Sequence, residues 1–212
     1  MITITLSIIV LTGIISFTAF SNETITSDLI FYPPAITQRK QWYRFFTSGL
    51  IHADIMHLIF NMYSFYLFGE MVESAFNTIY GESGKIIYGI LYVSALLVCL
   101  LPTYLKHQND YHYRSLGASG AVSAVIFAGI FLFPTLGMSI FPIPFHIPGF
   151  IFGPLYLILS FYLANKGHGN INHSAHVWGA LYGIVYLIIT ATFLSKINLI
   201  SNFLDQVIGY LR

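Results

Sequence analysis

The chain has 212 residues, of which 56% are hydrophobic and only 8% are charged, and its formal net charge is +1. Soluble domains carry about 25% charged residues, so this composition excludes an ordinary soluble protein. The absence of a basic surplus excludes a nucleic-acid-binding protein. We therefore expect an all-α, polytopic membrane protein that lies in the lipid bilayer, and the length allows one domain, residues 1–212.

Six apolar segments are candidate membrane spans, since a spanning helix needs about 20 mainly apolar residues. The first span, within residues 1–20, lacks a basic start and a small-residue cleavage site, so we interpret it as a retained helix rather than a signal peptide. The fourth and fifth segments are short, which a position inside a bundle allows. The six segments lie near residues 2–20, 53–76, 85–105, 117–133, 150–165 and 174–195.

The segments outside the spans differ in character. Residues 21–51 carry Pro33-Pro34 and then an aromatic, basic run whose tryptophan and tyrosine indicate an interfacial position. Residues 134–149 contain four prolines and cannot form one continuous helix. Residues 196–212 place apolar side chains at helical spacing among polar ones, which predicts an amphipathic C-terminal tail at the membrane interface.

Polar side chains stand inside the apolar second span, where their cost makes them functional candidates. His57 and Asn61 are four residues apart and share a helix face, and His52 falls at the start of the same helix. Such a face must turn into the bundle or into a water-filled cavity. Two interpretations stay open: these groups join helices by hydrogen bonds, or they stabilise a reacting group.

A second polar group is predicted from the fourth and sixth spans. Ser119 stands between Gly117 and Gly120 at the start of a segment rich in small residues, and His176 shares a helix face with Gly179 and Gly183. Small residues allow helices to approach closely. If these two faces pack together, Ser119 comes within hydrogen-bond reach of His176, as an activated serine requires. The alternative is that the small residues serve packing alone.

No acidic residue lies near His176 in the sequence, so the pattern predicts a Ser–His dyad rather than a triad. A tetrahedral oxyanion would need donors, and His57, Asn61 and the backbone N–H of Ser119 are suitable groups. A metal-dependent hydrolase is a weaker alternative: His168, His173 and His176 cluster, but neither H-E-x-x-H nor a carboxylate accompanies them. A membrane transporter is weaker too, because no internal repeat is visible.

These residues resemble the rhomboid family of intramembrane serine proteases. In chain order, residues 52–61 fit the family's H-x-x-x-x-H-x-x-x-N motif, residues 117–120 fit G-x-S-G, and residues 175–183 fit A-H-x-x-G-x-x-x-G. The resemblance covers residues 40–195. It implies a six-transmembrane-helix, rhomboid-like bundle that acts as a serine endopeptidase on membrane-protein substrates with a transmembrane segment. It implies no cofactor and no metal.

The resemblance also assigns roles to individual residues. Ser119 is the nucleophile, and His176 is the general base and then the acid. The resemblance implies that the oxyanion is stabilised or supported by His57, Asn61, Gly117 and His52, together with the Ser119 amide. In the first loop, Tyr43-Arg44 resembles the family's aromatic–arginine element, and Glu73 falls where the family has a carboxylate that ties to this arginine.

One departure from the family pattern concerns the catalytic histidine. Many bacterial members have a tyrosine four residues after the serine, stacked on this histidine, and here that position is Ser123. Another aromatic residue, or the surroundings of Trp178, would then hold His176. The alternative function is an inactive rhomboid-like binding protein, which the intact Ser119 and His176 disfavour.

Membrane orientation is argued in two ways that disagree. The positive-inside rule favours termini outside, because six basic residues fall opposite the termini and three fall on their side. The family topology puts the termini in the cytoplasm, and we follow it because three motifs outweigh a small charge bias. The expected location is a bacterial inner (plasma) membrane, and no extra cytosolic domain is expected. The two sets are Arg39, Lys40, Arg44, Lys106, Arg114 and Lys166 against Lys85, Lys196 and Arg212.

Overall fold

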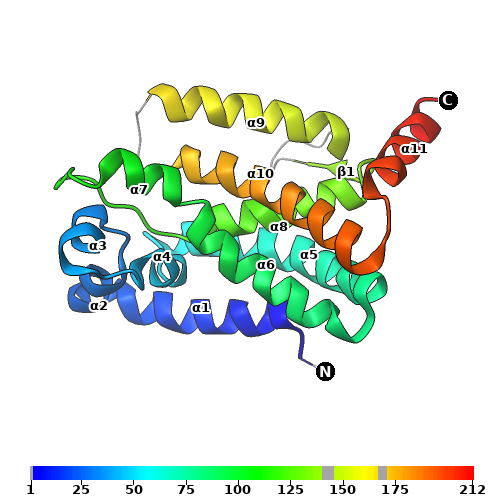
Figure 1. The fold of residues 1–212 in the computed structure, drawn as a ribbon. Coiled ribbons are helices and arrows are strands. Elements are labelled where there is room, and N and C mark those ends of the chain that lie inside the picture. Colours follow the sequence, from blue (N-terminus) through cyan, green and yellow to red (C-terminus); the bar gives the residue numbers. More distant parts are fainter. Residues whose placement is uncertain (1, 140–145, 167–170) are drawn as a thin grey trace.

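The computed structural model describes residues 2–139, 146–166 and 171–212, and these are mostly helical. Among the described residues, six helices correspond to the six predicted spans. Figure 1 shows them packed as a bundle, with both chain ends toward the same end of it. The six are α1 (Ile4–Phe20), α5 (Ile55–Tyr80), α6 (Gly84–Val98), α8 (Ser119–Leu132), α9 (Gly149–Lys166) and α10 (His173–Thr190).

Shorter elements connect the six helices. Four prolines in the connection 134–149 predict that it cannot form one continuous helix, and its described residues hold a two-stranded antiparallel pair. The C-terminal tail is helical, as its spacing predicts, and its position at the interface stays a prediction. The short elements are α2 (Glu23–Leu29), α3 (Pro33–Arg39), α4 (Arg44–Thr47), η1 (Ser48–Leu50), η2 (Gly81–Ser83), α7 (Leu101–His107), β1 (Gly137–Met138), β2 (Ile147–Pro148), η3 (Ala191–Ser195) and α11 (Leu199–Leu211).

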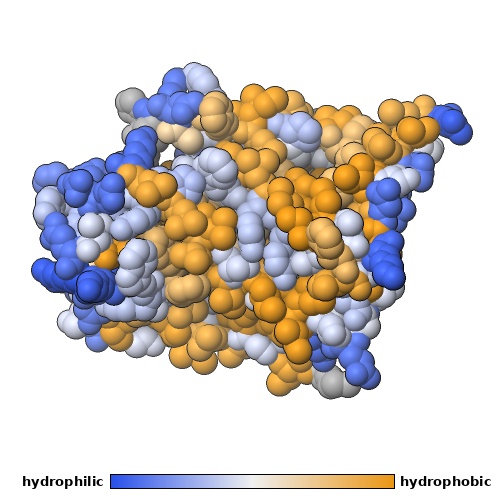
Figure 2. Space-filling view, viewed as in Figure 1, coloured by the Kyte–Doolittle hydropathy of each residue, from blue (hydrophilic) through white to orange (hydrophobic). Residues whose placement is uncertain are grey.

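The outer surface of the bundle is apolar. Figure 2 shows hydrophobic residues over the middle of one face and hydrophilic residues gathered toward its two ends. Large side chains such as Val10, Ile59 and Ile158 are more than half exposed. Contiguous apolar area of this extent marks contact with lipid or a partner rather than with water. Within the described residues, two helical stretches are long and apolar enough to cross a membrane alone, Ile55–His107 and His173–Ser195.

Helix α8 forms the centre of the bundle and is buried along most of its length. Its 14 residues span about 21 Å, less than the roughly 30 Å of a hydrocarbon core. A short helix is tolerated here because its neighbours, rather than lipid, surround it. The expectation that the fourth span is short and internal is therefore confirmed, and one end of α8 must lie below the membrane surface.

Two glycines let α10 touch the backbone of α8. A Cβ atom on Gly179 would overlap the carbonyl oxygen of Gly120, and a Cβ on Gly183 would overlap that of Ala124. The contact is between main chains, so no side chain could move aside to make room. The close packing of small faces that the G-x-x-x-G spacing predicts is confirmed.

A buried carboxylate on α5 holds the start of α1. Glu73 accepts hydrogen bonds from the backbone N–H groups of Ile4 and Thr5 and from the Thr5 hydroxyl, each 2.9 Å long. These N–H groups open α1, so the carboxylate also meets the positive end of the helix dipole. The Thr5 hydroxyl lies 2.9 Å from that of Tyr88 in α6. Three helices are thus joined at one buried carboxyl group.

The expected tie between Glu73 and Arg44 is wrong. Arg44 is buried in α4, where its Nε donates to Gln41 and its Nη1 donates to the carbonyls of Ser27 and Ile30. It therefore braces the connection 21–51 from within. Glu73 stands 18 residues beyond the start of α5, about 27 Å along the helix. Arg44 belongs to α4, which lies at the end of the bundle opposite the N-terminus (Figure 1), whereas Glu73 binds the N-terminal residues of α1.

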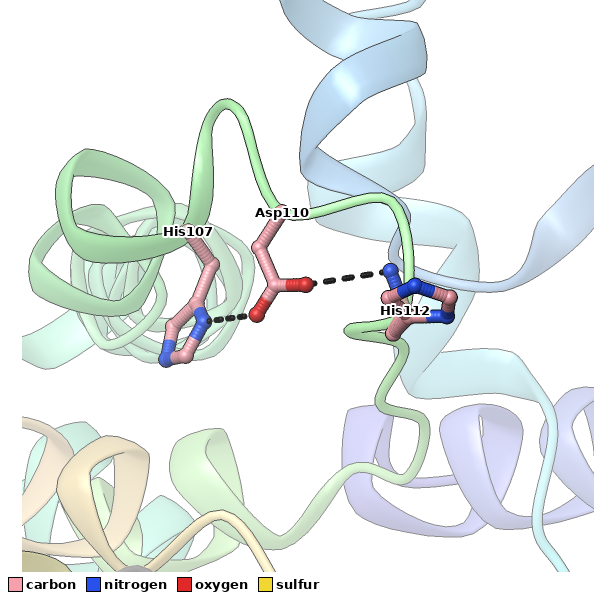
Figure 3. Close-up of polar contacts among 3 residues, drawn as sticks. All are labelled: His107, Asp110 and His112. Atoms are coloured by element: carbon pink, nitrogen blue, oxygen red, sulfur yellow. Dashed lines mark hydrogen bonds and ion pairs between the residues drawn. The ribbon is translucent and has the colours of Figure 1, made fainter.

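The turn that leads into α8 is organised by Asp110. Its carboxylate accepts hydrogen bonds from Nδ1 of His107 and from the backbone N–H of His112, both 3.0 Å long (Figure 3). The hydrogen bond from His107, more than that from the His112 amide, lowers the pKa of Asp110. The ring of His107 stacks on Tyr113 with centroids 3.8 Å apart. These contacts order an exposed loop just ahead of the central helix.

Replacement of Glu73 tests the anchor of α1. We expect Glu73→Ala to lower the free energy of unfolding by about 2–4 kcal/mol, because it leaves buried N–H groups without an acceptor. Thermal unfolding in detergent micelles measures this change. The control Glu82→Ala alters an exposed carboxylate in η2 and should have no effect. Equal stability of the two variants would contradict the anchoring role.

Replacement of Asp110 tests whether its hydrogen bonds in the loop ahead of α8 stabilise the fold. Because its pKa is lower in the folded state than the ordinary 3.8, its contacts stabilise the fold above that pH and stop doing so as the pH falls through the folded-state pKa. We expect Asp110→Asn to unfold at a slightly lower temperature than the unmodified protein at pH 7, with the gap narrowing as the pH falls below 3.8. Asp205→Asn, in α11, is the matched control. A gap that does not narrow as the pH falls from 3.8 toward the acid limit of the folded state would refute this account.

Candidate active site

Ser119 and His176 meet at the ends of α8 and α10. Ser119 is the first residue of α8, and His176 lies in the first turn of α10. The Ser119 Oγ is 2.7 Å from Nε2 of His176, a hydrogen-bond distance. Both side chains are partly buried. The close approach of the two helices through Gly179 and Gly183 brings the hydroxyl and the imidazole to the same level, as the sequence predicts.

A tight turn at Gly117 directs the chain into α8. Gly117 has φ +112°, in the region that favours glycine, and a Cβ there would lie 2.8 Å from Cε1 of His57. Its N–H donates to the carbonyl of Ser48 over 2.9 Å. The next amide, of Ala118, donates to Nε2 of His52 over 3.4 Å. The backbone just before Ser119 is thus held from two sides.

The N-terminus of α8 has no side-chain cap. Ala118 occupies the capping position without a side-chain hydrogen bond, and the first turn has no acidic residue. The opening N–H groups of a helix have no acceptor within the helix, and they carry a partial positive charge. A helix start of this kind, beside the Ser119 hydroxyl, is suited to receive a negative charge.

His52 lies behind this helix start rather than at the hydroxyl. Because its Nε2 accepts from Ala118, its Nδ1 carries the proton and donates to Ser16 Oγ over 3.0 Å. Ser16 in turn donates to the carbonyl of Leu50 over 2.9 Å. One buried imidazole therefore links α1, the connection before α5 and the start of α8.

His57 lies against the turn, and Asn61 lies one helical turn away from it. The Nδ1 of His57 accepts a 3.4 Å hydrogen bond from the Ala53 amide, which leaves the ring proton on Nε2. The same ring packs edge-on to His52, with centroids 4.9 Å apart. The Asn61 Nδ2 donates to the carbonyl of His57 within α5. The structure therefore brings the His57 ring up to Gly117.

Sequence reasoning missed the partner of His176, which is Tyr156 in α9. The hydroxyl of Tyr156 lies 3.2 Å from Nδ1 of His176. The general expectation that another aromatic replaces the tyrosine missing at Ser123 is right. The side chain of Trp178 is 47% exposed, and the described partner of His176 at Nδ1 is Tyr156. Tyr156 and Ser160, four residues apart in an apolar segment, were the available signal.

The histidines considered as metal ligands do not form a described cluster. His173 packs edge-on to His176 with centroids 5.7 Å apart. His168 lies outside the described residues. Across residues 2–139, 146–166 and 171–212, the structure has no group of three His, Cys, Asp or Glu residues placed to hold a metal ion.

The fold and its apolar surface define a polytopic integral membrane protein. The family model for the Rhomboid domain matches residues 39–193, and the chain therefore belongs to the rhomboid family.

Individual relatives agree with this family. Rhomboid-like protein 15 of Arabidopsis thaliana is 25% identical over 86% of the chain and 45% of the relative. The putative rhomboid protease YdcA of Bacillus subtilis is 28% identical over 68% of the chain and 65% of the relative. The rhomboid protease GlpG of Haemophilus influenzae is 25% identical over 74% of each. The chain thus spans less than two thirds of the length of the first two relatives.

The helix contact beneath the site is tested at Gly183. We expect Gly183→Ala to lower the free energy of unfolding by about 1–3 kcal/mol, because the added methyl group meets the backbone of α8. Thermal unfolding in detergent is the measurement. In the control Gly13→Ala, on α1, the new Cβ meets nothing within 4 Å, so the better helix propensity of alanine leaves stability equal or higher. Similar behaviour of both variants would contradict the contact.

Proposed function

We propose that this protein is an intramembrane serine endopeptidase that cleaves peptide bonds in or next to transmembrane segments of membrane proteins. The single observation that carries the proposal is the 2.7 Å contact between Ser119 Oγ and His176 Nε2, at the start of a buried helix. A serine hydroxyl beside a neutral imidazole is the pairing that nucleophilic catalysis needs. Membership of a family with proteases among its relatives supports the same assignment.

In the proposed mechanism, Ser119 Oγ attacks the carbonyl carbon of the scissile bond while His176 Nε2 takes its proton. The resulting imidazolium gives this proton to the departing amine nitrogen, and an acyl-enzyme forms. Water then attacks the acyl carbon while Nε2 takes a proton from it. The bond between this carbon and Ser119 Oγ breaks as Nε2 gives the proton to Oγ, and the new C-terminal carboxylic acid leaves. Each step needs only the two side chains and water, so no cofactor or metal enters the chemistry.

The developing oxyanion lies, in this proposal, at the uncapped start of α8. The Ser119 amide and its neighbours supply preorganised donors, together with the positive end of the helix dipole. His57 adds its Nε2–H, because Nδ1 is occupied by the Ala53 amide. Asn61 retains a second N–H on Nδ2 beyond the one that bonds to His57. Gly117 keeps this space clear, and His52 holds the backbone beside it.

The substrate class follows from the surroundings of the dyad. Because α8 is shorter than the hydrocarbon core, at least one of its ends lies below the membrane surface. In this proposal it is the end that carries the dyad, which is then within reach of a peptide already in the bilayer. The apolar outer surface receives such a segment from lipid. We place the protein in a bacterial inner (plasma) membrane, in line with its Bacillus and Haemophilus relatives.

A fluorophosphonate probe tests the nucleophile. We expect the purified protein in detergent to be labelled and to cleave a single-span test protein in liposomes. Ser119→Ala and His176→Ala should each lower both signals by more than about a thousandfold, because neither half of the dyad works alone. Ser74→Ala, toward the other end of α5, is the matched control and should retain full activity.

The remaining outcomes separate the alternatives. Robust labelling of the Ser119→Ala protein would refute the assignment. Absence of labelling and cleavage in a correctly folded unmodified protein would favour an inactive rhomboid-like binding protein. Cleavage that a chelator abolishes would favour a metal-dependent hydrolase, and substrate flux without cleavage would favour a transporter.

A further inference from the structure

The imidazole of His176 has contacts at both ring nitrogens, and they come from different helices. Nε2 lies 2.7 Å from Ser119 Oγ of α8, and Nδ1 lies 3.2 Å from the hydroxyl of Tyr156 of α9. The side chains of Ser123 and Ser160 lie close to the Tyr156 hydroxyl. A buried polar chain therefore runs from α9 through the imidazole to the serine. No carboxylate among the described residues hydrogen-bonds to this ring.

We propose that Tyr156 is the positioning residue of His176, and that it takes from α9 the orienting role that an acidic residue has in a catalytic triad. This inference rests on the proposed function, because it concerns the base of the same reaction.

The hydrogen-bond directions follow from the chemistry of a neutral imidazole. If Ser119 is to donate its proton to Nε2, then Nε2 must be free of hydrogen, and the ring proton must be on Nδ1. The Nδ1–H group then donates to the Tyr156 oxygen. The Tyr156 hydroxyl hydrogen can in turn point toward the nearby hydroxyl groups of Ser123 and Ser160. With this acceptor in place, the tautomer that can act as a base is the favoured one.

The same contact continues through the reaction. When Nε2 takes the proton of Ser119, the ring becomes an imidazolium with N–H groups on both sides. Its Nδ1–H still donates to Tyr156, and a hydrogen bond from a charged donor is stronger than one from a neutral donor. Without this acceptor, the ring could turn about its side-chain bonds or carry its proton on Nε2, and either change disables the base.

Packing holds the Tyr156 ring at the right place. Its ring lies against those of Phe127 and Phe152, with centroids 5.7 Å and 6.1 Å away. Gly153, one turn earlier, faces α8, and a Cβ there would lie 3.4 Å from the Phe127 ring. The small side chain of Ser123 leaves room for a hydroxyl that arrives from α9. A tyrosine on α8 is therefore not required to orient His176.

Tyr156→Phe tests the inference, because it removes only the hydroxyl and keeps the packed ring. We expect kcat for the single-span test protein to fall on the order of tenfold with KM unchanged, as for loss of one hydrogen bond to a charged group. The rate of Ser119 labelling by the fluorophosphonate should fall in parallel, with the unfolding temperature retained. Tyr162→Phe is the matched control, because Tyr162 is on the same helix but 53% exposed. It should behave as the unmodified protein.

The outcomes separate the two proposals. If Tyr156→Phe keeps full kcat and labelling while Ser119→Ala is inactive, the positioning role is overturned and the protease assignment stands. If Ser119→Ala retains activity, the protease assignment itself fails. A loss that Tyr162→Phe shares, that appears in KM alone, or that accompanies a lowered unfolding temperature also overturns the positioning role.

Discussion

The contact between the main chains of α8 and α10 is the constraint on which the candidate site depends. In a bilayer, apolar side chains gain nothing from leaving lipid for one another, so helices associate through close packing and hydrogen bonds. Gly179 and Gly183 allow the two backbones to come into contact. This contact fixes the axial position of the N-terminus of α8 relative to the N-terminus of α10. A hydrogen bond between Ser119 and His176 tolerates errors of only a few tenths of an ångström. The two glycines, which have no side chains, thus determine the distance between the side chains of Ser119 and His176.

Much of this arrangement could be predicted from the sequence because its signals are local. The six spans follow from runs of apolar residues, and the helices begin and end within a few residues of the predicted limits, except that the third ends at Val98 and α7 continues it. The meeting of Ser119 with His176 followed from small residues on two helix faces. The family membership confirms the motif-based resemblance. The catalytic roles of these residues stay predictions.

The parts that could not be predicted depend on partners distant in the sequence. Glu73 carries no local sign that it accepts from the first amides of α1, because the start of α1 is an ordinary apolar segment. A family pattern directed it instead to Arg44, whose donors the nearby carbonyls already occupy. Tyr156 was overlooked for a related reason. A tyrosine in an apolar helix is usual, and only the depth and rotation of α9 in the bundle show that its hydroxyl meets an imidazole.

The first helix, α1, is held by hydrogen bonds at two points along its length, and these contacts fix the number of residues between the two points. Thr5 is bound to Glu73 on α5, and Ser16 is bound to His52, about three helical turns away. Both side chains lie on one buried face of α1. One residue inserted between them would rotate Ser16 by about 100° relative to Thr5 and carry its hydroxyl toward lipid. The lipid-facing residues of α1 are therefore free to vary in kind, whereas the number of residues between these two points is not.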